Sequence, residues 1–214
     1  MRKLILSTLL LAVISVTAFS QKAESQKPEY RSTVSIGAGP SIIGKVGGLL
    51  NKIEIPDSAA TMSFDAKLVY GITYDYRIFK WFSVGAAFSI QKMGGTFYDF
   101  HYKDFDDVLK YINVNYDVTR LNFAVRPLFH YGNSPKLDMY SGFRMGMLSS
   151  SVALNAEVPG LVKQDIFKFG LGRRVCFQMV GFGIKYYITK NIGINTEIAI
   201  GAPYFLSGGL NVRF

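Results

Sequence analysis

Three things are scarce in this 214-residue chain, and each scarcity excludes a class of protein. Only 18% of the residues are charged, below the usual quarter for soluble domains, although 49% are hydrophobic. After the N-terminal segment, no apolar run reaches the roughly 18 residues that a membrane-spanning helix needs. The single cysteine, Cys176, excludes an intrachain disulfide. A hydrophobic chain without membrane helices leaves the closed β-barrel as the other structure able to span a bilayer.

The N-terminal segment has the three parts of a secretory signal peptide. Residues 2 and 3 are basic, residues 4–16 are apolar, and Ala18 and Ser20 are the small residues that a signal peptidase accepts. We therefore expect a signal peptide over residues 1–20, cleaved between Ser20 and Gln21. A flexible lead-in over residues 21–30 would follow, and then a single folded domain over residues 31–214.

The chain is basic, with 24 Lys and Arg against 15 Asp and Glu, but the basic residues are scattered singly. No basic stripe forms, so nucleic acid is not expected as a partner. Contacts with anionic lipid head groups or phosphorylated sugars are a more natural use of the excess charge.

From Arg31 onward, hydrophobic residues alternate with small or polar ones. Between residues 192 and 201, four isoleucines occupy even positions, whereas Asn195 and Glu197 occupy odd ones. Such a period of two is typical of strands with one apolar face. Eight strands joined by alternating short turns and longer loops predict an all-β fold, an eight-stranded antiparallel up-and-down transmembrane β-barrel with periplasmic turns. The predicted strands cover residues 34–42, 67–77, 82–91, 120–130, 138–147, 179–188, 192–201 and 206–214.

Alternation would also fit a soluble lipocalin-like barrel, so the outward face has to be decided separately. The less hydrophobic face is rich in Gly, Ala and Ser with few long charges, which suits a crowded bore better than a water-exposed surface. Aromatic residues gather near both ends of the strands, as bilayer interfaces select. We therefore expect the apolar face to contact lipid. The aromatic residues are Tyr74, Tyr76, Trp81, Phe82, Phe129, Tyr131 and Tyr186 near the short turns, and Phe97, Tyr98, Tyr116, Phe167, Phe169 and Tyr204 toward the loops.

Ten charged residues fall on the face predicted to line the bore. An eight-stranded barrel is just wide enough for side chains to fill, and unpaired buried charge is costly. We expect these residues to form an ion-pair network that plugs the bore, although their basic excess leaves open a narrow path that favours anions. They are Lys67, Asp75, Arg77, Arg120, Arg126, Asp138, Arg144, Lys185, Glu197 and Arg213.

The stretch 104–113 between two predicted strands carries apolar residues at helical spacing. Phe105, Val108, Leu109 and Ile112 fall at i, i+3, i+4 and i+7. This pattern predicts a short amphipathic helix. The helix would either pack over the barrel mouth or offer a docking surface for a protein partner or the membrane.

Catalysis is not expected, because the chain has only two histidines. His130 lies beside a predicted periplasmic turn, and no serine nucleophile motif accompanies His101. The acidic residues near Asp104 lack the glycine and glutamate of a calcium-binding loop. Neither a metal nor a cofactor is expected.

The last residues, Leu210-x-Val212-x-Phe214, resemble the terminal signal that outer-membrane barrels present to the barrel assembly machinery. Similar hairpins follow Tyr76 and Tyr186. With the leader, these features make residues 31–214 resemble the OmpA/OmpX-like and PorT-like small barrel families. The resemblance is one of pattern and brings no functional motif. It implies insertion by the barrel assembly machinery into the outer membrane of a Gram-negative bacterium, among outer-membrane lipids.

The leading hypothesis is a non-enzymatic outer-membrane barrel with a structural or interaction role and a protein partner at its loops. Three alternatives remain open at this point. They are a narrow channel or transporter for small or hydrophobic solutes, a PorT-like accessory of a secretion system, and a lipase-like enzyme using His101.

Overall fold

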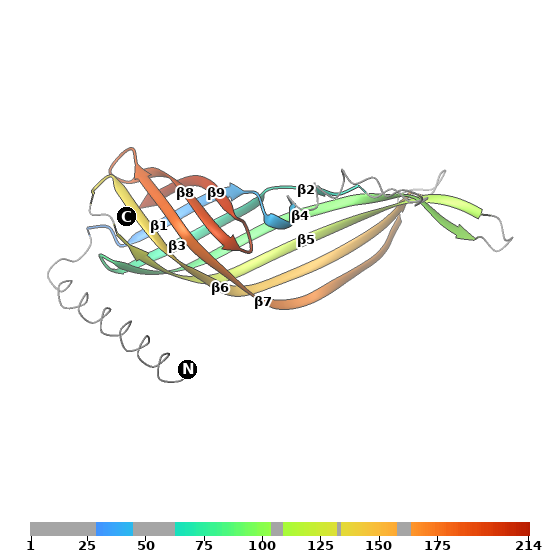
Figure 1. Ribbon diagram of the computed structural model, residues 1–214, viewed down its shortest axis with the longest axis horizontal. Coiled ribbons are helices and arrows are strands. Elements are labelled where there is room, and N and C mark those ends of the chain that lie inside the picture. Colours follow the sequence, from blue (N-terminus) through green and yellow to red (C-terminus); the bar gives the residue numbers. More distant parts are fainter. Residues whose placement is uncertain (1–28, 45–62, 104–108, 132–133, 158–163) are drawn as a thin grey trace, which may run out of the picture.

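The computed structural model describes residues 29–44, 63–103, 109–131, 134–157 and 164–214, so the predicted signal peptide lies outside the described residues. Within these ranges the chain forms a single antiparallel sheet, in which eight strands pair in a ring (Figure 1). The predicted all-β, eight-stranded architecture is confirmed. The strands are β1 (Ser32–Gly39), β2 (Asp65–Ala66), β3 (Val69–Phe79), β4 (Phe82–Lys103), β5 (Leu109–His130), β6 (Leu137–Glu157), β7 (Gln164–Tyr187), β8 (Ile192–Gly201) and β9 (Leu206–Arg213), of which the two-residue β2 lies outside the ring.

The ring closes where the first strand meets the last. β1 pairs with β9, with Ile36 opposite Leu210, and the backbones of Ser32 and Phe214 exchange two hydrogen bonds of 2.9 Å. Each of the other ring strands pairs with its neighbours in sequence order, β3 taking the place next to β1. This order is that of an up-and-down barrel. In the described part of the chain, no helix is long and apolar enough to cross a membrane.

The two ends of the barrel differ. Three short connections, at residues 80–81, 131–136 and 188–191, lie at the same end as the C-terminus, and we name this the turn end. The opposite end, where residues 202–205 join β8 to β9, is named the loop end.

The faces of the strands are sorted as the sequence predicts. Ile194 on β8 is 48% exposed, whereas Glu197 on the same strand is 2% exposed. The outer surface is therefore an apolar belt, and the polar residues point into the bore. The belt includes Ile36, Ile72, Phe88, Phe123, Val125, Met145, Phe177, Ile198, Leu210, Val212 and Phe214.

Aromatic rings border this belt at the turn end. The ring of Trp81 stacks on Phe79 and Phe129 at centroid distances of 5.8 and 6.1 Å. Two aromatics predicted for the opposite border are placed differently, because Tyr116 and Tyr204 are buried and face inward. Their hydroxyl groups find partners there, which a lipid-facing position would not supply.

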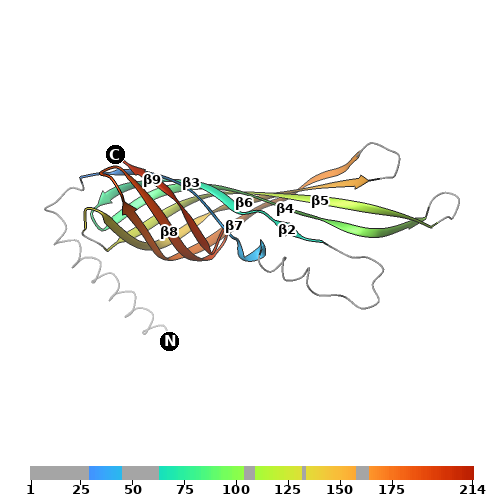
Figure 2. The ribbon, with the colours of Figure 1, turned by 90° about the horizontal axis from the view of Figure 1, so that it is seen from above.

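Four strands are about twice as long as predicted. β4, β5, β6 and β7 contain 22, 22, 21 and 24 residues, and they extend at the loop end well beyond the other strands (Figures 1 and 2). Most of the stretches 93–114 and 151–173, which alternation assigns to loops, are strand instead. Each hairpin extends because the neighbouring strand continues to supply hydrogen-bond partners.

The prediction of a helix over residues 104–113 is wrong in its second half, which is a strand. Leu109 and Ile112 belong to β5, where they pair with Lys103 and Phe100 of β4. Phe105 and Val108 lie outside the described residues. The local helical spacing is outweighed by the β-sheet ladder, since residues such as Tyr111 and Val114 favour strands.

A β-bulge reverses the predicted faces on part of β7. The pairing with β8 shifts between Val180 and Phe182, which adds one residue at Gly181. On the loop-end side of the bulge, Val180 is buried and Met179 is exposed, opposite to the prediction. On the turn-end side, Lys185 faces the bore as predicted.

The apolar belt ends along one row of paired residues on the four long strands. Lys92 pairs with Thr119, and Thr119 pairs with Ser151. On the outward face Lys92 follows Ile90 and Thr119 precedes Leu121 directly, whereas on β6 Ser149 lies between Met147 and Ser151. We name the region beyond this row the protruding sheet, residues 93–103, 109–118, 152–157 and 164–169. At about 3.3 Å per residue it extends about 30 Å along the strands.

In the protruding sheet the polarity of the two faces is inverted. Two rows on the inward face are apolar across all four strands apart from one glycine, whereas the outward face carries polar residues such as Thr96, Asn115 and Asp117. A surface beyond the bilayer needs a polar exterior, so the alternation continues with its phase reversed. The apolar rows are Met93–Val118–Val152–Phe169 and Gly95–Tyr116–Leu154–Phe167.

This border makes a prediction about where charge is tolerated. Val125→Arg, in the middle of the apolar belt, should destabilise the barrel by about 2–4 kcal/mol, whereas Thr119→Arg at the border should cost about 0–1 kcal/mol. Reversible denaturant unfolding in lipid vesicles measures both. Equal losses for the two variants would contradict the position of the border.

Candidate functional site in the barrel lumen

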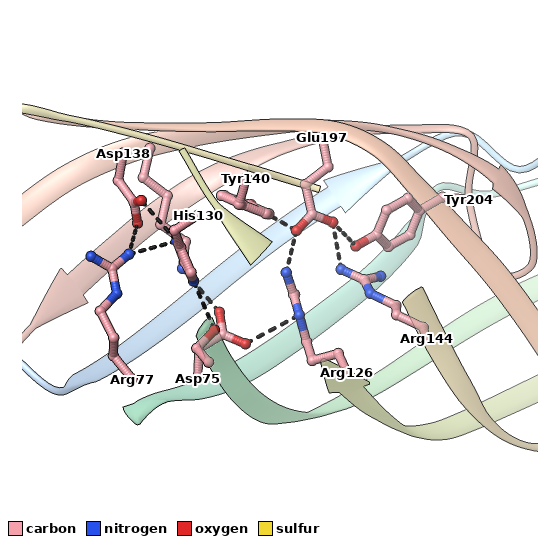
Figure 3. Close-up of polar contacts among 11 residues, drawn as sticks. Asp75, Arg77, Arg126, His130, Asp138, Tyr140, Arg144, Glu197 and Tyr204 are labelled. Carbon is pink, nitrogen blue, oxygen red and sulfur yellow. Dashed lines mark hydrogen bonds and ion pairs between the residues drawn. The ribbon is translucent and has the colours of Figure 1, made fainter. Parts of the chain in front are cut away.

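Glu197 on β8 is the centre of the charged residues in the bore (Figure 3). Its Oε1 accepts hydrogen bonds from Arg126 at 2.5 Å and Tyr140 at 2.7 Å. Its Oε2 accepts from Arg144 at 2.5 Å and Tyr204 at 2.9 Å. One carboxylate therefore joins β5, β6, β8 and the connection between β8 and β9.

The network continues from Arg126 to the opposite wall. The Nε atom of Arg126 lies 3.1 Å from Oδ1 of Asp75 on β3, and Lys185 on β7 donates to Oδ2 of Asp75 at 2.9 Å. Cations and anions thus alternate in the order Lys185, Asp75, Arg126, Glu197, Arg144. All five side chains are at most 3% exposed.

Small residues make room for these long side chains. A Cβ atom at Gly183 would overlap the ring of Tyr140, and one at Gly85 would overlap the carboxylate of Asp75. Arg126 and Lys185 lie 5.9 and 5.1 Å from the ring centre of Tyr140, at cation–π distance. The glycine-rich inward face is therefore the counterpart of the charged network.

A second cluster lies closer to the turn end. Asp138 on β6 contacts Arg77 at 2.5 Å through Oδ2 and His130 at 2.8 Å through Oδ1. The Nε2 atom of His130 lies 2.8 Å from the hydroxyl of Ser83. Ser83, His130 and Asp138 are thus connected in the order of a serine hydrolase triad.

This triad-like arrangement is enclosed rather than open to a substrate. Ser83 is 1% exposed, and Arg77 occupies the remaining oxygen of Asp138. The backbone of Ser83 belongs to strand ladders with β3 and β5, so its amide group is not arranged as an oxyanion hole. The cluster therefore fills the bore at the turn end. Within the described ranges, no group of His, Cys, Asp and Glu could hold a metal ion.

Of the ten charged residues predicted for the bore, the structure brings seven together, namely Asp75, Arg77, Arg126, Asp138, Arg144, Lys185 and Glu197. Lys67 is exposed and precedes β3, and Arg120 lies two residues beyond Asn122 toward the loop end. Arg213 sits at the turn end, where its guanidinium lies 3.7 Å from the ring centre of Tyr187 and 4.3 Å from that of Tyr30.

Some members of the network were not singled out from the sequence. Tyr140 shares the inward parity of Asp138 and Arg144, so the period of two contains its signal. Gln178 donates to the backbone oxygen of Tyr204. Its inward position could not be predicted from the alternation, because the bulge at Gly181 exchanges the two faces of the strand. Tyr204 lies outside the strands, and no periodicity points to it. The residues of the proposed assembly signal, Leu210, Val212 and Phe214, are exposed on the outer face.

The chain is an eight-stranded membrane β-barrel. No known family model matches it, and no curated protein sequence matches it significantly. Solved structures that resemble it include Ail of Yersinia pestis, at 13% identity and a TM-score of 0.43, covering 87% of this chain and 100% of that one. Another is the N-terminal barrel domain of Pseudomonas aeruginosa OprF, at 14% identity and 0.39, with the same coverage.

The network predicts unequal roles for two buried carboxylates. Glu197→Gln leaves Arg126 and Arg144 without their shared counterion, so the barrel should lose about 3–5 kcal/mol. The matched change Asp138→Asn should cost less, because the side chain of Arg77 is 24% exposed and can reach water. Denaturant unfolding of both variants in detergent measures the difference. An equal or larger loss in Asp138→Asn would show that Glu197 is not the centre of the network.

Proposed function

We propose that the protein is a non-enzymatic outer-membrane barrel that acts as an interaction protein, its bore plugged and its protruding sheet offering a binding face. The observation that carries the proposal is the inverted polarity of the protruding sheet. An apolar belt has lipid to contact, but an apolar inward face beyond the bilayer does not. Such a face is suited to a partner or ligand with apolar groups.

The binding face is formed by the two apolar rows of the protruding sheet. Phe167 and Phe169 on β7 are 58% and 38% exposed, with ring centres 5.5 Å apart. At the other side of the face, Phe97 lies 5.1 Å from Tyr116. Exposed aromatic side chains such as Phe167 and Phe169 supply contact area at low cost in conformational entropy, whereas Tyr116 is buried and supports the face from below.

The bore supports an interaction role better than transport. The alternating charges around Glu197 cross from β3 to β8, and the cluster around Asp138 lies between them and the turn end. A solute would have to displace paired, desolvated charges at two successive levels. A narrow channel remains the alternative function, favoured by the basic excess within the bore.

The orientation follows from the proposed export route. The signal peptide would carry the chain across the inner membrane, and the barrel assembly machinery would insert it with the turn end in the periplasm. The exposed residues Leu210, Val212 and Phe214 suit recognition by that machinery. Lys92 and Arg173, exposed at or near the border of the belt, suit contacts with the anionic head groups of outer-membrane lipids.

A plugged bore predicts electrical silence. In planar bilayers the wild-type protein should give no steady single-channel steps, whereas a charge-balanced variant with alanine in place of Glu197, Arg144, Asp138 and Arg77 should give them. This variant removes one anion and one cation from each of the two levels where the bore is filled, so the contrast reports the plug itself. Steps of equal size in the wild-type protein would favour the channel.

The binding face predicts where a partner can be captured. A photo-crosslinking amino acid at Phe169, on the apolar face, should give covalent adducts in intact cells. The same amino acid at Lys168, one residue away on the outward face, is the matched control and should give few. Adducts with a secretion component would identify the PorT-like role. Equal yields at the two positions, or none at Phe169, would contradict the proposed face.

A further inference from the structure

A small cavity lies in the bore on the loop-end side of the ion pairs. Its volume is about 30 Å³, the space of about two water molecules. Arg144, Arg126 and Glu197 form its floor, and Ser35 and Asn195 contribute to its walls. Further hydroxyl and amide groups also line it, from Thr73, Ser89, Asn122, Tyr204 and Ser207.

The charges at this level do not balance. Lys185, Arg126 and Arg144 contribute three positive charges, against two negative charges from Asp75 and Glu197. Arg144 is the residue at the end of the alternating series, and it lines the cavity. An excess positive charge inside a barrel surrounded by lipid attracts an anion strongly, because the medium screens it little.

Several residues that line the cavity also carry buried polar atoms that lack hydrogen bonds. The Nε atom of Arg144, the hydroxyl of Ser35 and Oδ1 of Asn195 have no hydrogen-bond partner among the described residues. The residue Ser35 is 5% exposed, so water outside the bore hardly reaches it. Guanidinium and hydroxyl groups are donors, and the amide of Asn195 can present its NH₂ by a simple flip.

We propose that this cavity binds a small monovalent inorganic anion, chloride being the obvious candidate. The anion balances the excess charge at Arg144 and accepts hydrogen bonds from hydroxyl and amide groups of the residues that line the cavity. A cavity with room for about two water molecules admits a halide. This inference does not depend on what the protruding sheet binds, since the cavity lies inside the bore.

Bromide, which replaces chloride and scatters anomalously, gives a direct test. Crystals of the refolded protein soaked in sodium bromide should show an anomalous peak between Arg144, Ser35 and Asn195. Ordered water at this position with no anomalous peak would overturn the proposal.

A solution test uses an internal replacement for the anion. In the wild-type protein, exchanging sodium gluconate for sodium chloride at equal ionic strength should raise the unfolding temperature on a heat-modifiability gel by at least about 2 °C. Asn195→Asp, an isosteric change that places a carboxylate in the cavity, should abolish this rise. Asn191→Asp, the same charge change on the exposed turn after β7, should keep it. A rise of the same size in Asn195→Asp would overturn the proposal, because it would then be a general salt effect.

Discussion

The closed ladder of hydrogen bonds between the strands is the constraint on which the rest of this structure depends. Lipid offers no partners to backbone amide and carbonyl groups, so a strand edge cannot be left open within the bilayer. Pairing β1 with β9 removes that edge. Closure with eight strands also limits the width of the bore, which is why long charged side chains must share it with glycines such as Gly85 and Gly183.

The ladder has a different consequence outside the bilayer. The long strands β4 to β7 keep pairing after their neighbours have ended, so they form an open sheet with one face toward the axis of the barrel. The period of two is a property of the strand and does not change, but the surroundings of each face do. Tyr116 therefore has the inward parity that Asn122 and Arg126 have on the same strand within the bore, and Met93 has that of Gln91 on β4.

This change of phase explains where the sequence was informative and where it was not. Residues 192–201 lie wholly within the belt, and their strand, its faces and the inward position of Glu197 could all be predicted. The alternation of apolar and polar residues changes phase between residues 82–91 and residues 93–103 of β4. The sequence pattern therefore predicted that the strand ends near residue 91. The helical spacing around Leu109 was misleading because a short stretch of sequence does not reveal the partner strand, β4, with which these residues pair.

The candidate site shows a similar division. Parity alone placed Asp75, Arg126, Arg144 and Glu197 in the bore, but their mutual contacts depend on the register between strands. Ser83 on β4 and His130 on β5 are 47 residues apart in the sequence, so no local pattern encodes the contact between them. The bulge at Gly181 hid Gln178, because one extra residue exchanges the two faces.

Because the strands differ in length, the wall of the barrel is higher on one side than on the other at the loop end. On the side of β8 and β9, strands of 10 and 8 residues end close to the ion pairs, while the strands on the other side continue outward. A large molecule that approaches the loop end parallel to the membrane therefore meets a high wall from one direction and a low wall from the other. Neighbouring membrane proteins would control access by the side on which they stand, even without touching the mouth.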